Sequence, residues 1–249
     1  KNVILSAGAI GTPTILKRSN LSSNAGKNLE MHPTIKILAV FDEDINQGKV
    51  GVGVHQVSEF NERFTFGCSV STKPYLKLAL QKFPEYKARV DKEWKKMAIY
   101  YVSIISDGKG SIKHLPFTAN PTVKYTLTKN DLNNFEDGIN KLCKLLFKAD
   151  AKKIFTGTGD KLDMNSNKLI TLSFEQLSNY EISTVHLFSS CPMGENKDLC
   201  VVDSFGKVHN QNGLYVSDCS MLPSSTGVNP QGTVMSFAYR NIKKIISEL

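Results

Sequence analysis

The sequence predicts a mixed fold, in which the two chain ends form an α/β arrangement and the region between them is α+β. Three observations predict it. The chain opens with an apolar strand, a turn of small residues and a helix, and it closes with an apolar strand followed by a helix. Between these ends, strands and helices follow one another without regular β-α-β alternation. The 249 residues, 41% hydrophobic and 22% charged, suit a globular chain of one or two domains.

The first predicted elements are a strand, a turn and a helix. Residues 3–5 form an apolar strand, and residues 6–11 are almost all small. Thr12 is a good helix N-cap and Pro13 fits the first helical position, so we expect a helix that runs to Arg18. This order of elements lets backbone approach a nucleotide closely, but it is also an ordinary turn. The phosphate-binding pattern G-x-G-x-x-G occurs nowhere in the chain.

The middle of the chain predicts an antiparallel sheet with helices. Two segments show strand-like apolar patterns, and a third is rich in β-forming residues, which is typical of a central strand. Apolar residues then recur at spacings of three and four, the pattern of an amphipathic helix. The expected elements are strands at 34–42, 63–70 and 97–106, a hairpin of 111–115 and 122–128, and helices at 74–96, with a break near Pro84, and at 129–149.

The C-terminal region carries the densest group of unusual motifs. Residues 201–208 predict strand, turn and strand, and residues 214–218 predict an apolar strand that ends in Asp218. Asn229 and Pro230 fit the N-cap and the first position of a last helix. The residues expected to form its buried stripe are Met235, Ala238, Ile242, Ile245 and Leu249.

These C-terminal residues suit chemistry on a nucleotide cofactor. A carboxylate at the end of a strand, facing a helix N-terminus, is a favourable place for a nucleotide. The helix dipole can hold the anion of a reduced flavin, and a histidine such as His186 can take a proton from an alcohol. Each residue also has a structural alternative: His186 fits a core histidine, Asn229 a helix cap and Asp218 a turn cap.

The charge and the cysteines limit the other function classes. The net charge is +8, but only four of the 31 basic residues are Arg, the residue that nucleic-acid readers favour. No nucleic acid partner is therefore expected. No apolar run approaches the roughly 20 residues of a membrane-spanning helix. The five cysteines lack the spacing of a metal site, so no metal is predicted, and they are expected to be reduced thiols in a cytoplasmic compartment.

Six motifs in order resemble the glucose-methanol-choline (GMC) flavoprotein oxidoreductases. The opening V-I-L-S-A-G-A-I-G-T-P-x-I-L is similar to the second signature of that family, and G-K-N-L-x-x-H-P at 26–33 to its next segment. Near the C-terminus, the matching motifs are H-x-x-S-S-C-x-M-G at His186, V-V-D-x-x-G-x-V around Asp203, L-Y-V-S-D-x-S-x-x-P around Asp218 and G-V-N-P-Q-x-T around Asn229. The sequence looks most like bacterial alcohol dehydrogenases and long-chain alcohol oxidases.

The resemblance implies an FAD-dependent enzyme that removes a hydride from the CH–OH group of a small-molecule alcohol and passes it to flavin N5. His186 matches the catalytic base of the family, and Asn229 matches the residue that positions the substrate oxygen. The residues that map close to the flavin or the nucleotide are Gly8, Ala9, Asp218, Pro230, Gln231 and Thr233. His32 is expected to be structural.

The resemblance also predicts the domain organisation. Residues 1–33 and 200–249 are expected to form part of a Rossmann-like FAD-binding domain, and residues 34–199 a substrate-binding domain. The signature that binds the pyrophosphate is absent, so the missing partner would be an N-terminal FAD-binding half of a longer protein. The alternatives are a catalytically silent fragment, a subunit that needs a separate N-terminal chain, or a basic interaction module. The expected location is cytoplasmic, or peripheral to a membrane.

Overall fold

A computed structural model describes residues 1–47, 56–57, 59–60, 62–115, 118 and 120–247. The chain divides into two compact units. Unit 1 comprises residues 1–32, 106–128 and 184–249, and unit 2 comprises residues 33–105 and 129–183. The boundary between the units near residue 33 agrees with the expected domain boundary. The segments 106–128 and 184–199, which were expected to belong to the middle domain, instead group with the chain ends in unit 1. They do so because both segments form backbone bonds with residues 26–31.

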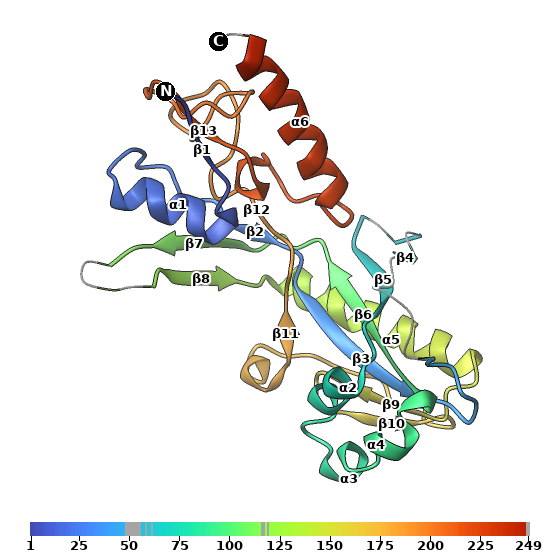
Figure 1. Cartoon of the computed structure of the whole chain (residues 1–249). Helices are drawn as coiled ribbons and strands as arrows, with labels where there is room; N and C mark the ends of the chain where they lie inside the picture. Colours follow the sequence, from blue (N-terminus) through green and yellow to red (C-terminus); the bar gives the residue numbers. More distant parts are fainter. Residues whose placement is uncertain (48–55, 58, 61, 116–117, 119, 248–249) are drawn as a thin grey trace. The chain divides into compact units, whose positions relative to one another are not determined.

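Unit 2 is built on one antiparallel sheet (Figure 1). Within the described residues the strand order is β10-β9-β3-β6-β5-β4, and β11 also pairs with β3. The strand β6 lies inside the sheet, as predicted for the segment 97–106. The strands are β3 (Thr34–Val40), β4 (Gln56–Val57), β5 (Phe64–Ser69), β6 (Met97–Ile104), β9 (Lys153–Thr156), β10 (Lys161–Asp163) and β11 (Ile182–Ser183).

Helices cover both faces of this sheet because its central strands are apolar on both sides. From β3, Ile35 and Ile37 join a core cluster with Phe135 of helix α5 (Lys129–Lys148), whereas Leu38 joins a second cluster with Leu76. That second cluster includes residues of the short helices on the other face. These are α2 (Lys73–Ala79), α3 (Pro84–Lys87) and α4 (Val90–Glu93), followed by the 3-10 turns η1 (Trp94–Lys96) and, later in the chain, η2 (Leu177–Asn179).

The break predicted near Pro84 in the helical segment 74–96 is present, and the structure divides the segment further into these short pieces. Pro84 has no N–H to donate, and the residue before a proline is disfavoured in the helical region. Phe83 accordingly has φ −130° and ψ 72°, and a new helix starts at Pro84. The proline therefore ends one helix rather than bending a continuous one.

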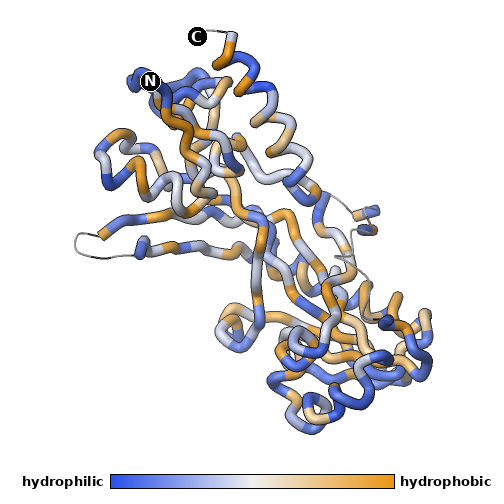
Figure 2. Tube along the Cα trace, viewed as in Figure 1, coloured by the Kyte–Doolittle hydropathy of each residue, from blue (hydrophilic) through white to orange (hydrophobic). Residues whose placement is uncertain are grey.

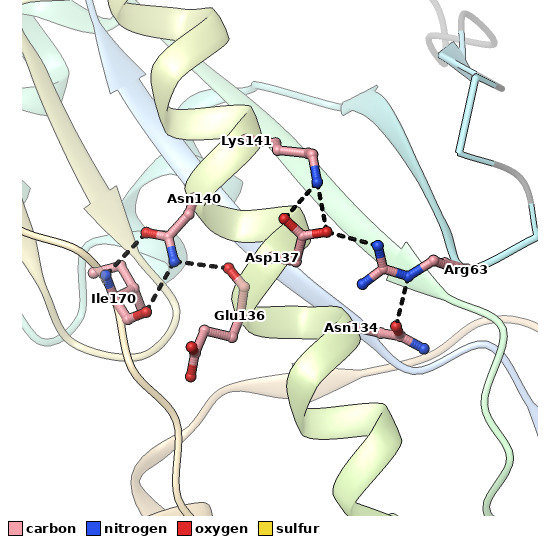
Figure 3. Close-up of polar contacts among 7 residues, drawn as sticks. All are labelled: Arg63, Asn134, Glu136, Asp137, Asn140, Lys141 and Ile170. Carbon is pink, nitrogen blue, oxygen red and sulfur yellow. Dashed lines mark hydrogen bonds and ion pairs between the residues drawn. The ribbon is translucent and has the colours of Figure 1, made fainter.

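Helix α5 is held to the rest of unit 2 by polar contacts as well as by its apolar face (Figure 3). Asn140 donates from Nδ2 to the carbonyl of Ile170 and accepts the Ile170 N–H, each at 2.9 Å. Arg63 donates to Asn134 and pairs with Asp137 of the same helix. These contacts therefore fix α5 to the residue that precedes β5 and to the extended segment around Ile170.

Unit 1 combines three short strand pairs with two longer helices (Figure 1). As predicted, the first strand and the strand at 214–216 share a sheet; they are parallel, with Val3 opposite Leu214. The hairpin predicted around Pro121 is also present. The elements are β1 (Val3–Leu5), α1 (Gly8–Arg18), β2 (Glu30–Met31), β7 (Lys109–Lys113), β8 (Thr122–Thr126), β12 (Leu187–Phe188), β13 (Leu214–Val216), η3 (Cys219–Met221) and α6 (Gln231–Ser247).

The first helix starts at Gly8, earlier than the predicted start at Pro13, which lies inside the helix. A proline at this position cannot donate to the carbonyl of the residue four places earlier, which is Ala9. That carbonyl instead accepts a hydrogen bond from Ser190 Oγ at 2.6 Å. The buried Ser190 hydroxyl thus replaces the missing helix bond and fixes the segment after His186 to α1.

The buried stripe predicted for the last helix is wrong for two of its members, whereas Ala238 is half-buried. Ile245 is buried, but Met235 is 64% exposed, and Ile242 also lies at the surface. Leu249 lies outside the described residues. Figure 2 shows apolar residues along both α6 and β1, and the Val3 side chain of β1 is likewise exposed. The pattern predicted the helix correctly, whereas burial depends on what packs against it. In the described part of the chain, no helix is long and apolar enough to cross a membrane.

Candidate functional site

The predicted site residues all belong to unit 1, and a two-stranded pairing fixes the segment that carries His186. In this pairing Leu187 lies opposite Met31 and Phe188 opposite Glu30. The His186 carbonyl accepts the His32 N–H at 3.2 Å, which extends the pairing by one step. The His186 N–H donates to Thr184 Oγ1 at 3.1 Å. The backbone of His186 is therefore held on both sides, and its ring direction follows from β12.

Two histidine rings meet at this point. Nδ1 of His186 lies 3.3 Å from Nδ1 of His32, and the ring planes are nearly perpendicular. His32 is 5% exposed and also contacts the ring of Phe188. Burial, followed by the charge of His186, lowers the pKa of His32 to about 4, and burial lowers the pKa of His186 as well. Both rings are therefore neutral at pH 7, which a proton acceptor requires.

This histidine pair predicts that stability falls in acid. In the unfolded chain the pKa of a histidine is near 6.5. Between pH 6.5 and 4, His32 is therefore protonated in the unfolded state and neutral in the folded state. The contribution of His32 to the free energy of unfolding is complete above pH 6.5. It is lost as the pH falls to about 4, a change of roughly 3 kcal/mol. Urea midpoints measured by circular dichroism at pH 7 and 4.5 should show this loss. His32→Leu should reduce the difference, whereas His114→Asn, on the hairpin, should retain it.

The residue three places after His186 is held in an unusual backbone conformation. Ser189 has φ 60° and is fully buried, and its Oγ has no hydrogen-bond partner among the described residues. A left-handed conformation costs a residue with a Cβ about 1–2 kcal/mol, and a buried hydroxyl without a partner adds to that cost. The conformation directs Ser190 toward the Ala9 carbonyl.

Ser189→Gly should therefore stabilise unit 1 by roughly 1 kcal/mol, because glycine adopts this conformation without strain. The measurement is the urea midpoint at pH 7. Asn210→Gly is the matched control: Asn210 has φ 61°, but asparagine tolerates the left-handed region and the gain should be smaller. Equal gains in both variants would contradict the explanation by strain.

The structure brings Gly8 and Asp218 into direct contact. Oδ2 of Asp218 accepts the Gly8 N–H at 3.0 Å and the Thr12 hydroxyl at 2.5 Å, and Oδ1 accepts the Ser220 N–H at 2.8 Å. Asp218 is 8% exposed, so its carboxylate joins the end of β13 to the first turn of α1. The structural alternative for Asp218 is thus observed, and contact of its side chain with a cofactor stays a prediction.

Residues at the start of the last helix are open to a ligand. Helix α6 begins at Gln231, two residues after Asn229, and the Pro230 carbonyl accepts the first helix bond, from Val234. The expectation that Asn229 caps this helix is therefore wrong by one residue. The N–H groups of Gln231, Gly232 and Thr233 precede the first helix bond, as at every helix start.

Two glycines leave the backbone of unit 1 unobstructed. A Cβ added to Gly232 would meet no atom within 4 Å, and the same is true at Gly8, where φ is +77°. Ala9, in contrast, is buried, and its carbonyl is used by Ser190. The open glycines and the helix start fit an anionic cofactor, because exposed N–H groups and unobstructed backbone are what such a group needs.

Sequence reasoning missed two residues that lie at this site. His32 was expected to be structural, yet its ring contacts His186. Glu30 was an unassigned position within the motif at 26–33; its carboxylate is buried and accepts the Ser225 N–H. The spacing of that motif contained a signal, since Glu30 and His32 are separated by one residue and so can share one side of a strand.

Comparison with known proteins identifies the relatives of this chain. The family model described as GMC oxidoreductase matches residues 106–238. An uncharacterised GMC-type oxidoreductase of Sinorhizobium fredii is 34% identical over 98% of this chain and 49% of its own length. A long-chain-alcohol oxidase of Arabidopsis thaliana is 26% identical over 95% of this chain and 36% of its own length. The chain thus spans about half or less of the length of these relatives.

Solved structures share the fold. Pyridoxine 4-oxidase from Mesorbium loti superposes with a TM-score of 0.69 at 16% identity, covering 98% of this chain and 51% of that chain. An FAD-dependent oxidoreductase from Chaetomium thermophilum gives 0.62 at 16% identity, covering 100% and 55%. With the family model matching more than half of the residues, the chain belongs to the GMC oxidoreductase family.

Proposed function

We propose that the chain is the C-terminal part of an FAD-dependent oxidoreductase that acts on the CH–OH group of an alcohol, with His186 as the base. The observation that carries the proposal is the neutral, half-buried His186 ring against His32. A base must accept a proton at the working pH, and burial keeps this ring unprotonated.

The histidine pair also defines which nitrogen is free to act. Between two Nδ1 atoms at hydrogen-bonding distance, one ring donates and the other accepts. When His186 donates from Nδ1, its Nε2 carries the lone pair and can take the proton of the alcohol. His32 then acts as the acceptor that holds this tautomer, as the partner of a catalytic imidazole does in general.

Asn229 is proposed to donate a hydrogen bond to the substrate oxygen, and the first turn of α6 to hold the cofactor. The groups involved are the backbone at Gly8 and Ala9, Asp218, and Pro230, Gln231 and Thr233 at the start of α6. Bound FAD supplies the acceptor for the hydride. We further propose that residues 1–33 and 200–249 belong to a Rossmann-like FAD-binding domain, and that the part of residues 34–199 that lies in unit 2 belongs to a substrate domain. The parallel pairing of β1 with β13, next to α1, supports the first part.

The second candidate is a subunit or silent fragment that needs a separate N-terminal chain. The observation that favours it is the share of the relatives covered, 49% for the protein of Sinorhizobium fredii. Adding a purified N-terminal FAD-binding half to this chain distinguishes a subunit from a silent fragment. Alcohol-dependent flavin reduction by the mixture supports the subunit, and reduction by neither the mixture nor the joined chain supports the silent fragment.

Flavin reduction by an alcohol under anaerobic conditions tests the main proposal, with the FAD-loaded full-length oxidoreductase. Asn229→Ala should lower the reduction rate roughly 10- to 100-fold, because a hydrogen bond to a group that becomes charged contributes about 1.5–3 kcal/mol. The melting temperature, measured in parallel, separates this effect on the rate from any effect of Asn229 on stability. Unchanged reduction rates in Asn229→Ala would contradict the role of Asn229.

A further inference from the structure

We propose that Glu30 is a positioning residue, whose carboxylate holds the loop that carries Asn229 against the strand pair that carries His186. This inference rests on the proposed function, because it concerns the relative placement of the two residues proposed for catalysis. It adds a residue to which the sequence motifs gave no role. Loop 222–230 denotes the segment between η3 and α6 that contains Ser225 and Asn229.

The bonding of Glu30 is that of an anchor. The residue is only 4% exposed, although carboxylates are almost never this buried unless they are paired. Oε2 accepts the Ser225 N–H at 2.7 Å, and Oε1 forms an ion pair with Lys109 of β7 and accepts from Asn28 Nδ2 at 3.5 Å. The two oxygens thus bind different partners, since Oε2 holds loop 222–230 and Oε1 is neutralised by a cation.

The position of Glu30 on β2 links the loop to His186. Glu30 lies opposite Phe188 in the β2–β12 pair, two residues from His186. His32, two residues further on, contacts the His186 ring. Glu30 therefore holds the loop and His32 contacts the ring of His186, while the backbone of β2 pairs with β12.

The distance along the chain is short enough for this anchor to matter. Asn229 is four residues after Ser225, and four extended residues span at most about 14 Å. Fixing Ser225 therefore limits where the Asn229 side chain can lie relative to His186. A misplacement of about 1 Å in a catalytic group can cost roughly 10²-fold in rate. A charge-assisted bond of a backbone N–H to a carboxylate is stronger than a neutral one, which suits an anchor.

Hydrogen exchange of the Ser225 amide, measured by NMR in the 249-residue chain, tests the anchor directly. Glu30→Ala removes the acceptor and should speed exchange at Ser225 roughly 10- to 100-fold. Glu30→Gln keeps an oxygen acceptor and should restore most of the protection. Lys109→Met removes the cation but leaves the acceptor, so protection should be retained. Asp163→Asn, which breaks the exposed ion pair with Lys153 in unit 2, is the control and should leave Ser225 unchanged.

A double-mutant cycle in the FAD-loaded full-length oxidoreductase tests whether Glu30 acts through Asn229. Glu30→Ala should lower the rate of flavin reduction roughly 10- to 100-fold in the wild-type background. In the Asn229→Ala background it should have almost no further effect, because the group that it positions is gone. Glu30→Gln should recover most of the rate.

The two experiments separate failure of this inference from failure of the proposed function. Unchanged exchange at Ser225 in Glu30→Ala overturns the anchor, whatever the enzyme does. Losses in rate that multiply in the double variant also overturn it, since Glu30 would then act independently of Asn229. If the wild-type enzyme does not reduce its flavin with alcohol, the proposed function is wrong, and the exchange data still decide whether Glu30 holds the loop.

Discussion

His186→Ala lowers the rate of flavin reduction by alcohol by about 10²–10⁴-fold, the usual contribution of a general base. The physical reason is that the alcohol proton loses its neutral acceptor, the ring that the contact with His32 holds in place. FAD content should stay at the wild-type level, because His186 is not proposed to bind the cofactor. The measurement is anaerobic stopped-flow reduction, with flavin absorbance read before and after.

His209→Ala is the matched control for this experiment. His209 also lies in unit 1, and its Nε2 contacts the Gly194 carbonyl at 2.9 Å, away from the His32 pair. The rate should change little. In the wild type, the rate should fall as the pH drops through the pKa of His186, which burial lowers, because only the neutral ring accepts a proton. A His186→Ala enzyme with the wild-type rate would assign this histidine to the core instead.

We expect Asp218→Ala to remove roughly 2–3 kcal/mol of stability from unit 1. The substitution deletes one buried carboxylate and leaves three donors without an acceptor: the Gly8 N–H, the Thr12 hydroxyl and the Ser220 N–H. Each buried group left unsatisfied costs about 1–3 kcal/mol. The loss should open the junction between β13 and α1. Exchange of the Ser217 amide, which donates to the Leu5 carbonyl, should speed up by roughly 10²-fold.

Asp203→Ala serves as the comparison for Asp218. Asp203 also accepts two backbone N–H groups, from Phe205 and Lys207, but it lies in a more exposed turn where water can replace it. Its loss should be about 1 kcal/mol or less. Thr12→Val, which removes one of the three donors to Asp218, should cost less than Asp218→Ala. Equal losses for Asp218 and Asp203 would show that burial of the first carboxylate has no special effect.

Local pattern predicted the elements whose partners lie nearby in the sequence. The hairpin around Pro121 and the helix at 129–148 appear where turn residues and three-four spacing indicate them. The pairing of β1 with β13 was also predictable, since both strands are short, apolar and followed by turns. The structure places His186 in the same unit as Gly8 and Asp218, whereas the domain division expected from the motifs put residue 186 in the middle segment, 34–199.

What the sequence could not predict depends on long-range contacts. The start of α1 at Gly8 depends on Ser190, whose hydroxyl takes the carbonyl that Pro13 leaves without a donor. Exposure of Met235 follows from what packs on α6, which periodicity does not contain. The roles of His32 and Glu30 arise only when β2 pairs with β12, because two alternate residues of a short motif can share a side of a strand without showing which segment they contact.

Unit 1 is formed by segments that are discontinuous in the sequence, and this affects the order in which the chain can fold. Its three segments are separated by the two segments of unit 2. Val3 pairs with Leu214, so most of the chain lies between the two paired strands. During synthesis, unit 2 is complete once residue 183 has left the ribosome, whereas β1 still lacks β13. Closing so long a loop is slow, because the entropy is lost before the contacts form. The apolar strand β1 is thus made early and paired late, and a chaperone that shields Val3 to Leu5 should raise the yield of folded protein.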